Sequence, residues 1–122
     1  MEQLRAKLAE LTHPATPVIV VVDQRGFIVH VDASLAGSLG WDPSDLVGRP
    51  LTRMIPPRFR DAHHLGFARY LATRRPTLLE RRLVAFTILH RDGRELPAQH
   101  VIVALETTHG LLFAAAVRVE AS

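Results

Sequence analysis

The most constraining feature of the sequence is the stretch of residues 55–73, IPPRFRDAHHLGFARYLAT. Its proline pair suits the first turn of a helix, where no backbone amide donor is needed. Five positions then share one stripe at helical spacing: Phe59, His63, Gly66, Phe67 and Tyr70. The stripe is apolar and aromatic except for one imidazole, and the glycine leaves space beside it. We therefore predict a helix that turns His63 toward the protein interior next to a gap.

Length and composition limit what surrounds this helix. With 122 residues the chain is long enough for one domain with its own core, and it contains no cysteine. The absence of cysteine excludes disulfides, thiolate metal sites and a cysteine nucleophile. No apolar run approaches the roughly 20 residues that span a bilayer, and the N-terminus lacks the apolar centre of a signal peptide. We expect a soluble, cytoplasmic domain with no membrane partner.

The charge is unevenly distributed along the chain. Residues 49–94 contain eleven arginines and three acidic residues, a balance of +8, whereas the remainder carries −5. Such asymmetry can mark a surface for an anionic partner, or simply a solvated arginine-rich surface. Aromatic residues that could stack on bases do not alternate with these arginines, so we expect no nucleic-acid partner.

The first residues read as a separate flanking element. Residues 2–11, EQLRAKLAEL, place Leu4, Leu8 and Leu11 at helical spacing, and the prolines that follow end the helix. A helix this short is not stable by itself. Its leucines therefore either pack across the domain's own sheet or pair with the same helix of a second copy of the chain. We assign residues 1–16 to a flanking helix and linker, and residues 17–122 to the domain. We also predict that the helix forms a homodimer.

The rest of the chain alternates between strand and helix patterns. β-branched or period-two segments predict strands at residues 18–22, 27–31, 83–90, 95–106 and 111–119. Gly26 and the Asp92-Gly93 pair mark hairpin turns. Between the second and third strands lie short helices, one capped by Asp32 or Ser34, and then the long helix. This order predicts an α+β domain with a five-stranded antiparallel sheet and all these helices on one face.

The same order of elements, with its particular residues, resembles the PAS domain family. The matching segments are VVDQRGFIVHVD (21–32), LGW (39–41), DLVGRP (45–50), MIPP (54–57), HRDGRELP (90–97) and LLFAAAVRV (111–119). Asp32 stands where the family usually has asparagine. The resemblance implies a sensor and interaction module, not an enzyme, with an effector that the sequence does not reveal. It also implies that a ligand can lie between the sheet and the helices. The flavin-thiol photochemical version is excluded because it needs a cysteine.

One part of the resemblance is to the heme-binding, FixL-like PAS domains. In these the proximal iron ligand is a histidine of the longest helix, in a pattern similar to Arg60-x-x-His63 through Arg69-Tyr70. The resemblance implies heme b as cofactor, with iron on His63 and a propionate on Arg69. Leu83 or Val84 would line the distal side, where the family has an arginine. The expected site residues are therefore His63, Arg69, Phe59, Phe67, Tyr70 and Leu83.

Several alternatives stay open at this point. His63 can be a helix-packing histidine, and the aromatic residues beside it can be ordinary core. Asp61, His63 and His64 would form a metal site only if His90 or His100 supplied a further ligand. The ligand can be heme, an apolar metabolite or a fatty acid, or the domain can be a ligand-free dimerisation module. A small enzyme with His63 as base is disfavoured because no nucleophile or carboxylate pair accompanies it.

Overall fold

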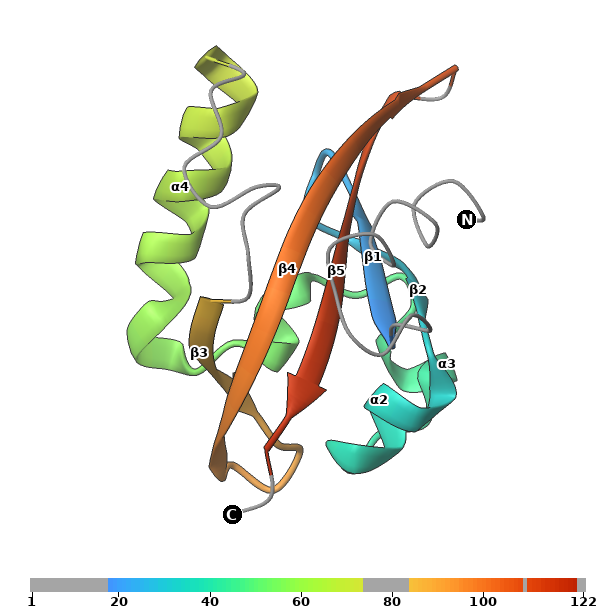
Figure 1. Ribbon diagram of the computed structural model, residues 1–122, viewed down its shortest axis with the longest axis vertical. Helices are drawn as coiled ribbons and strands as arrows, with labels where there is room; N and C mark the ends of the chain where they lie inside the picture. The colour runs from blue at the N-terminus through green and yellow to red at the C-terminus, as the bar shows by residue number, and fades with distance from the viewer. Residues whose placement is uncertain (1–17, 74–83, 109, 121–122) are drawn as a thin grey trace.

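The computed structural model describes residues 18–73, 84–108 and 110–120. It contains one five-stranded sheet in the order β2-β1-β5-β4-β3, and every neighbouring pair is antiparallel (Figure 1). The strands are β1 (Ile19–Asp23), β2 (Ile28–Val31), β3 (Val84–Leu89), β4 (Glu95–Thr107) and β5 (Gly110–Val119). The predicted α+β fold class and antiparallel sheet are confirmed. The predicted flanking helix lies outside the described residues.

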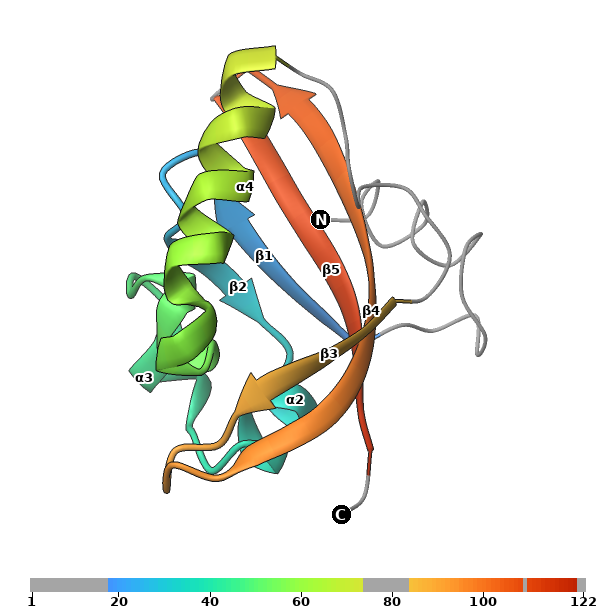
Figure 2. The same ribbon diagram turned by 90° about the vertical axis from the view of Figure 1, so that its left-hand side faces the viewer.

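The helical elements follow β2 in the chain and form the second layer. They are α2 (Ala33–Ser38), α3 (Pro43–Leu46), η1 (Leu51–Met54), η2 (Pro57–Phe59) and α4 (Arg60–Thr73). Figure 2 shows them on one side of the sheet, as the sequence predicted. The long helix begins later than expected. Its proline pair belongs to the separate 3-10 turn η2, and the α-helix starts only at Arg60, whose guanidinium Nε donates to the carbonyls of Thr52 and Ile55.

The capping residues explain where the short helices begin. Asp42 forms a complete capping box with Asp45 at the start of α3. Asp32 occupies the N-cap position of α2, but its carboxylate makes no capping bond. Instead, Oδ2 accepts from the Ile19 backbone N–H at 2.9 Å and Oδ1 contacts His30 Nε2 at 2.8 Å. The predicted side-chain cap by Asp32 is therefore wrong, because a bond across the β1–β2 hairpin uses this carboxylate.

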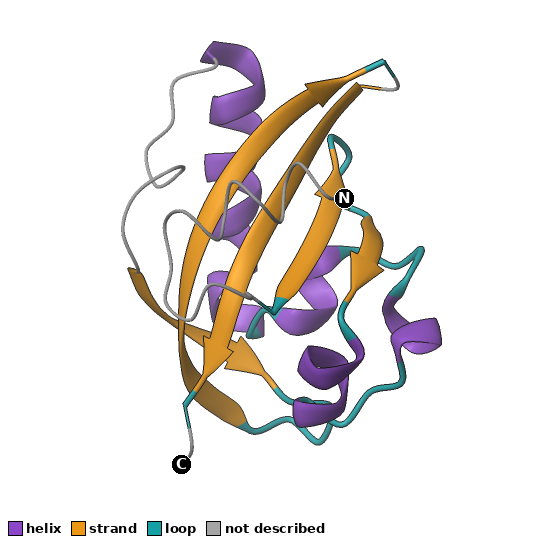
Figure 3. Ribbon diagram, turned by 45° about the vertical axis from the view of Figure 1, so that its right-hand side comes forward, coloured by secondary structure: helices purple, strands orange, loops and turns teal. Residues whose placement is uncertain are grey.

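The helices lie on one face of the sheet (Figure 3), and the two faces of the sheet bury different sets of side chains. The inner face packs against the helices, and its cluster includes Val20, Phe113 and Val117 from the strands with Leu35, Leu39, Leu46 and Met54 from the helical layer. The outer face carries a second cluster drawn only from strands: Ile19, Val21, Val101, Val103, Ala114 and Ala116. These six side chains are 0–5% exposed. Both faces of the central strands are therefore apolar, which fits their near-continuous hydrophobic runs.

Candidate ligand-binding site

The inner side of α4 carries the aromatic stripe that the sequence indicated. Phe67 and Tyr70 contact Phe113 of β5, with ring centroids 4.9 and 5.3 Å apart, and the His63 ring lies 6.0 Å from that of Phe67. A Cβ built on Gly66 would meet no other group within 4 Å. The prediction of an imidazole beside a gap at a glycine is thus confirmed. These contacts support the far half of α4 on the sheet and leave space around His63.

That space consists of two adjoining chambers between α4 and the sheet. The smaller chamber, about 200 Å³, lies beside Gly66, Phe67, Tyr70 and Phe113. The larger chamber, about 610 Å³, is open to solvent on one side and is lined by the start of α4, by η1 and η2, and by residues of β1, β3, β4 and β5. Five residues line both chambers: Val20, Leu51, His63, Ile102 and Ala115. The walls are largely apolar, and His63 stands where the two chambers meet.

His63 has the electrostatics of a neutral ligand. Its side chain is half-buried, and burial lowers its pKa below the usual histidine value, with a smaller contribution from repulsion by His64. The neutral imidazole is the form that binds a metal ion or accepts a hydrogen bond. His64, the next residue, is exposed and lines neither chamber. The structure therefore separates the two imidazoles as the helical stripe predicted.

A second imidazole lines the larger chamber from the opposite layer. His100 lies on β4, where alternate residues face the helices, and its ring centroid is 4.4 Å from that of Phe86. Its Nδ1 is buried and finds no hydrogen-bond partner among the described residues, and burial lowers the pKa of the imidazole. Sequence reasoning considered His100 only as a remote metal ligand. The period-two pattern of β4 could have placed it on the inner face, but not beside a cavity.

The remaining predicted site residues have mixed outcomes. Phe59 lines the larger chamber, but it lies in η2 and is 39% exposed, so its assignment to the core and to the α4 stripe is wrong. A 3-10 turn has three residues per turn, so it does not continue the stripe of an α-helix. Arg69 is exposed on α4 and lines neither chamber. Leu83 lies outside the described residues.

The possible metal site of Asp61, His63 and His64 is not assembled. Within residues 18–73, 84–108 and 110–120, no group of three or more acidic or histidine side chains is placed to hold a metal ion. Asp61 and His64 are exposed, and His90 belongs to a different cluster. The chemistry available around His63 is therefore that of one or two imidazoles in an apolar cavity.

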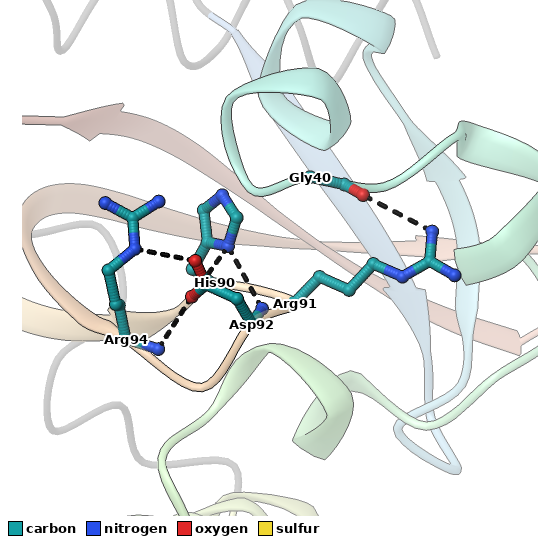
Figure 4. Close-up of polar contacts among 5 residues, drawn as sticks. All are labelled: Gly40, His90, Arg91, Asp92 and Arg94. Carbon is teal, nitrogen blue, oxygen red and sulfur yellow. Dashed lines mark hydrogen bonds and ion pairs between the residues drawn. The ribbon is translucent and has the colours of Figure 1, made fainter.

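The other polar cluster closes the β3–β4 hairpin and holds it against the α2–α3 loop (Figure 4). Asp92 accepts from the backbone N–H and the Nε of Arg94, and its Oδ1 lies 3.0 Å from His90 Nδ1. The Arg91 backbone N–H donates to the Leu39 carbonyl, and its guanidinium stacks 4.8 Å from the centre of the Trp41 ring. Each of these polar groups already has a partner within the protein, so we assign this cluster a structural role.

Comparison with known proteins identifies the family. The sequence model of the PAS fold family matches residues 6–115, and the chain belongs to this family. An uncharacterized protein of Azorhizobium caulinodans is 34% identical over 101 residues, which cover 82% of this chain and 14% of that protein. The chain thus spans about one seventh of the length of this relative.

Solved structures show the same fold at low sequence identity. The PAS domain of an HTR-like protein from Haloarcula marismortui is 22% identical, with a TM-score of 0.65, covering 98% of this chain and 100% of that one. A light-oxygen-voltage domain studied with a flavin analogue is 18% identical, with a TM-score of 0.65 and coverages of 88% and 80%. A PAS domain in complex with ethanol, from a LuxR-family transcriptional regulator of Burkholderia thailandensis, is 15% identical, with a TM-score of 0.63 and coverages of 90% and 94%.

Membership of the family defines the general role of the chain. PAS domains are generally sensory and interaction modules, as a family they bind various cofactors, and they commonly mediate dimerisation or protein interaction. None of the described helices is long and apolar enough to cross a membrane.

Proposed function

We propose that this PAS domain senses a small ligand held in the chambers between α4 and the sheet, with His63 as its polar contact. The observation that carries the proposal is the larger chamber of about 610 Å³ with His63 on its wall. Protein interiors are normally packed as densely as organic crystals, with few voids larger than water. A space of this size with apolar walls and few polar groups is typical of a small-molecule site. The ethanol complex from Burkholderia thailandensis supports the idea that this fold admits small molecules.

Heme b is our first candidate for the ligand. The donor chemistry fits, because His63 is half-buried, its pKa is lowered, and it lies among apolar and aromatic walls. Phe67 and Tyr70 would pack against the macrocycle, and Phe59 would cover its exposed side. Arg69, on the surface of α4, is the residue that we propose for a propionate, and Leu83, outside the described residues, stays among the proposed site residues. Bound heme would supply an iron centre whose ligation state is the signal. An apolar metabolite or fatty acid is the alternative ligand.

Reconstitution with hemin tests the identity of the ligand. The wild-type protein and the variant His64→Ala are expected to carry a Soret band through gel filtration, whereas His63→Ala loses or shifts it. The His64 variant is the matched control, because it removes an exposed imidazole from the same helix turn. Absence of the band in the wild type would eliminate heme. Equal binding by His63→Ala would make His63 a packing residue.

We further propose that the state of the ligand is relayed through a homodimer formed by the helix of residues 2–11. Its three leucines, Leu4, Leu8 and Leu11, are worth roughly 1.5–3 kcal/mol each when buried, enough for two copies to hold together. Deletion of residues 1–12 should convert a dimer into a monomer by light scattering. The double variant Leu4→Ala/Leu8→Ala should do the same, whereas Glu2→Ala/Glu10→Ala, on the side away from the leucines, should not. A dimer that survives the deletion would place the interface elsewhere.

The second candidate function is a ligand-free dimerisation module. It is favoured by the ring contacts of Phe67 and Tyr70 with Phe113, which already occupy part of the space under α4. Under this alternative, denaturation midpoints are unchanged by hemin or fatty acids, and dimerisation alone carries the signal. In either case the cytoplasmic location stays a prediction from the sequence.

A further inference from the structure

His100 carries a buried ring nitrogen, Nδ1, on the inner face of the sheet, and the described residues supply no hydrogen-bond partner for it. In the register of the sheet it lies opposite Val84 of β3 and Val117 of β5. Along β4, Ala98 and Ile102 precede and follow it on the same face, and Phe86 stacks beside it. No hydrogen bond to its Nδ1 comes from the described residues.

An unpaired imidazole nitrogen in such surroundings costs free energy. Leaving one buried donor or acceptor unsatisfied costs about 1–3 kcal/mol, and most buried polar groups in native proteins are paired. A leucine or valine at this position of the strand would avoid that cost and would suit the neighbouring residues. The ring also borders the larger chamber. The χ2 torsion of a histidine has broad, roughly two-fold preferences, so the His100 ring can turn either of its nitrogens toward the chamber. A partner located in the chamber would therefore satisfy the histidine.

His63 and His100 approach the same chamber from different layers. The helix α4 and the strand β4 belong to different layers (Figure 2). His63 comes from α4 and His100 from β4, and both line the larger chamber. A flat ligand that lies between the helix and the sheet would present one face to each layer. Both imidazoles are neutral near pH 7, because burial lowers the pKa of each. Neutral imidazoles on both sides of a macrocycle are suited to the two axial positions of one iron atom.

We propose that His100 is the second axial ligand of the heme that His63 binds, so that the resting iron is six-coordinate with two histidines. The inference rests on the proposed heme-binding function and deepens it. It departs from the expectation of a distal side lined only by Leu83 or Val84. An incoming ligand would have to displace His100, so that its binding would release a residue of β4 from the chamber. Coordination at the iron would in this way be coupled to the position of the sheet.

Absorption spectra of the hemin-reconstituted full chain test this assignment. The wild type should show a six-coordinate, low-spin ferric spectrum. His100→Leu should keep the heme but lose the low-spin bands and become high-spin, and added imidazole should restore the low-spin spectrum in the variant. His64→Ala controls for the removal of an imidazole outside the chamber. Far-ultraviolet circular dichroism checks that each variant folds, and His100→Met provides a second variant that keeps a possible iron ligand.

The outcomes separate the inference from the function on which it rests. A low-spin spectrum that changes in His100→Leu and recovers with imidazole supports the assignment. A heme-loaded wild type that is high-spin, or a low-spin spectrum unchanged in both His100 variants, overturns the role of His100 and leaves the role of His63 standing. A wild type that binds no heme overturns both proposals.

Discussion

The two ends of the helical layer differ in how they meet the sheet. At the α2–α3 end, Leu35, Ala36, Leu39 and Leu46 are 0–2% exposed. In α4, none of the side chains of residues 60–72 is buried, and Leu65 is 59% exposed. The difference shows that the helical layer is tightly packed at α2–α3, whereas α4 lies beside the two chambers.

Local anchoring accounts for the contrast. The short helices are held by backbone bonds to distant segments, including those from Ile28 to Arg49 and from Arg91 to Leu39. α4 is longer, at 14 residues, but a helix of that length is only marginally stable without packing. It is held by Arg60 at its start and by the rings of Phe67 and Tyr70 on Phe113. A ligand in the larger chamber would supply the packing that α4 lacks.

The largest expected effect is a difference in stability between the two ends. Leu39→Ala removes a fully buried side chain and should lower the free energy of unfolding by about 2–5 kcal/mol. Leu71→Ala, in the half-buried part of α4, should cost about 1 kcal/mol. Urea denaturation of the two variants measures both. Equal losses would show that α4 is as firmly packed as α2.

Alanine at two glycines should change stability in opposite directions. Gly40 has a φ of +82°, and a Cβ there would lie 2.8 Å from His90 Cε1 and 3.2 Å from Arg91 Cβ, so Gly40→Ala should cost about 1–3 kcal/mol. Gly66 lies within α4 beside open space, so Gly66→Ala should stabilise by about 0.5–1 kcal/mol. Thermal unfolding of this matched pair tests whether there is free space beside Gly66. A loss of stability in Gly66→Ala would show that there is not.

The two imidazoles of the chamber should make the ligand-free protein sensitive to mild acid. Burial lowers the folded-state pKa of both His63 and His100. Their contribution to stability is therefore present above the unfolded pKa of about 6.5 and is lost as the pH falls through the folded values. The melting temperature should drop between neutral pH and pH 5, and the drop should shrink in His63→Phe/His100→Phe. An unchanged drop in this double variant would assign the acid sensitivity to other groups.

The smallest effect is expected at the β3–β4 turn. The backbone N–H of Arg94 is the main cause of the lowered pKa of Asp92, and its guanidinium adds to it. This carboxylate contributes stability above its unfolded pKa of about 3.9, and the contribution is lost as the pH falls through the lower folded value. Asp92→Asn should therefore flatten the acid side of the stability profile and change little at pH 7. If the free energy of unfolding falls equally steeply with acid in the variant and the wild type, Asp92 does not make this contribution.

Local sequence patterns were sufficient for most of the elements. β-branched runs marked the strands, and Gly26 and Gly93 take the positive φ that their hairpin turns require. These patterns are reliable because the conformation of a turn or a strand depends mainly on residues within a few positions of it. Phe59 was misplaced because its proline pair favours a helix start in general and does not distinguish a 3-10 turn from an α-helix. The role of the Asp32 carboxylate could not be predicted from its neighbours alone, because one of its partners is the backbone N–H of Ile19, thirteen residues earlier.

For this protein, the sequence by itself determined the order of the elements and the faces they present, including the inward side of α4 with His63, Phe67 and Tyr70. Periodicity contains that information because side chains repeat every 3.6 residues in a helix and every two in a strand. Only the tertiary structure decided that α4 stands over a cavity and that His100 borders it. How closely two layers approach depends on every side chain between them, and no single segment contains that information.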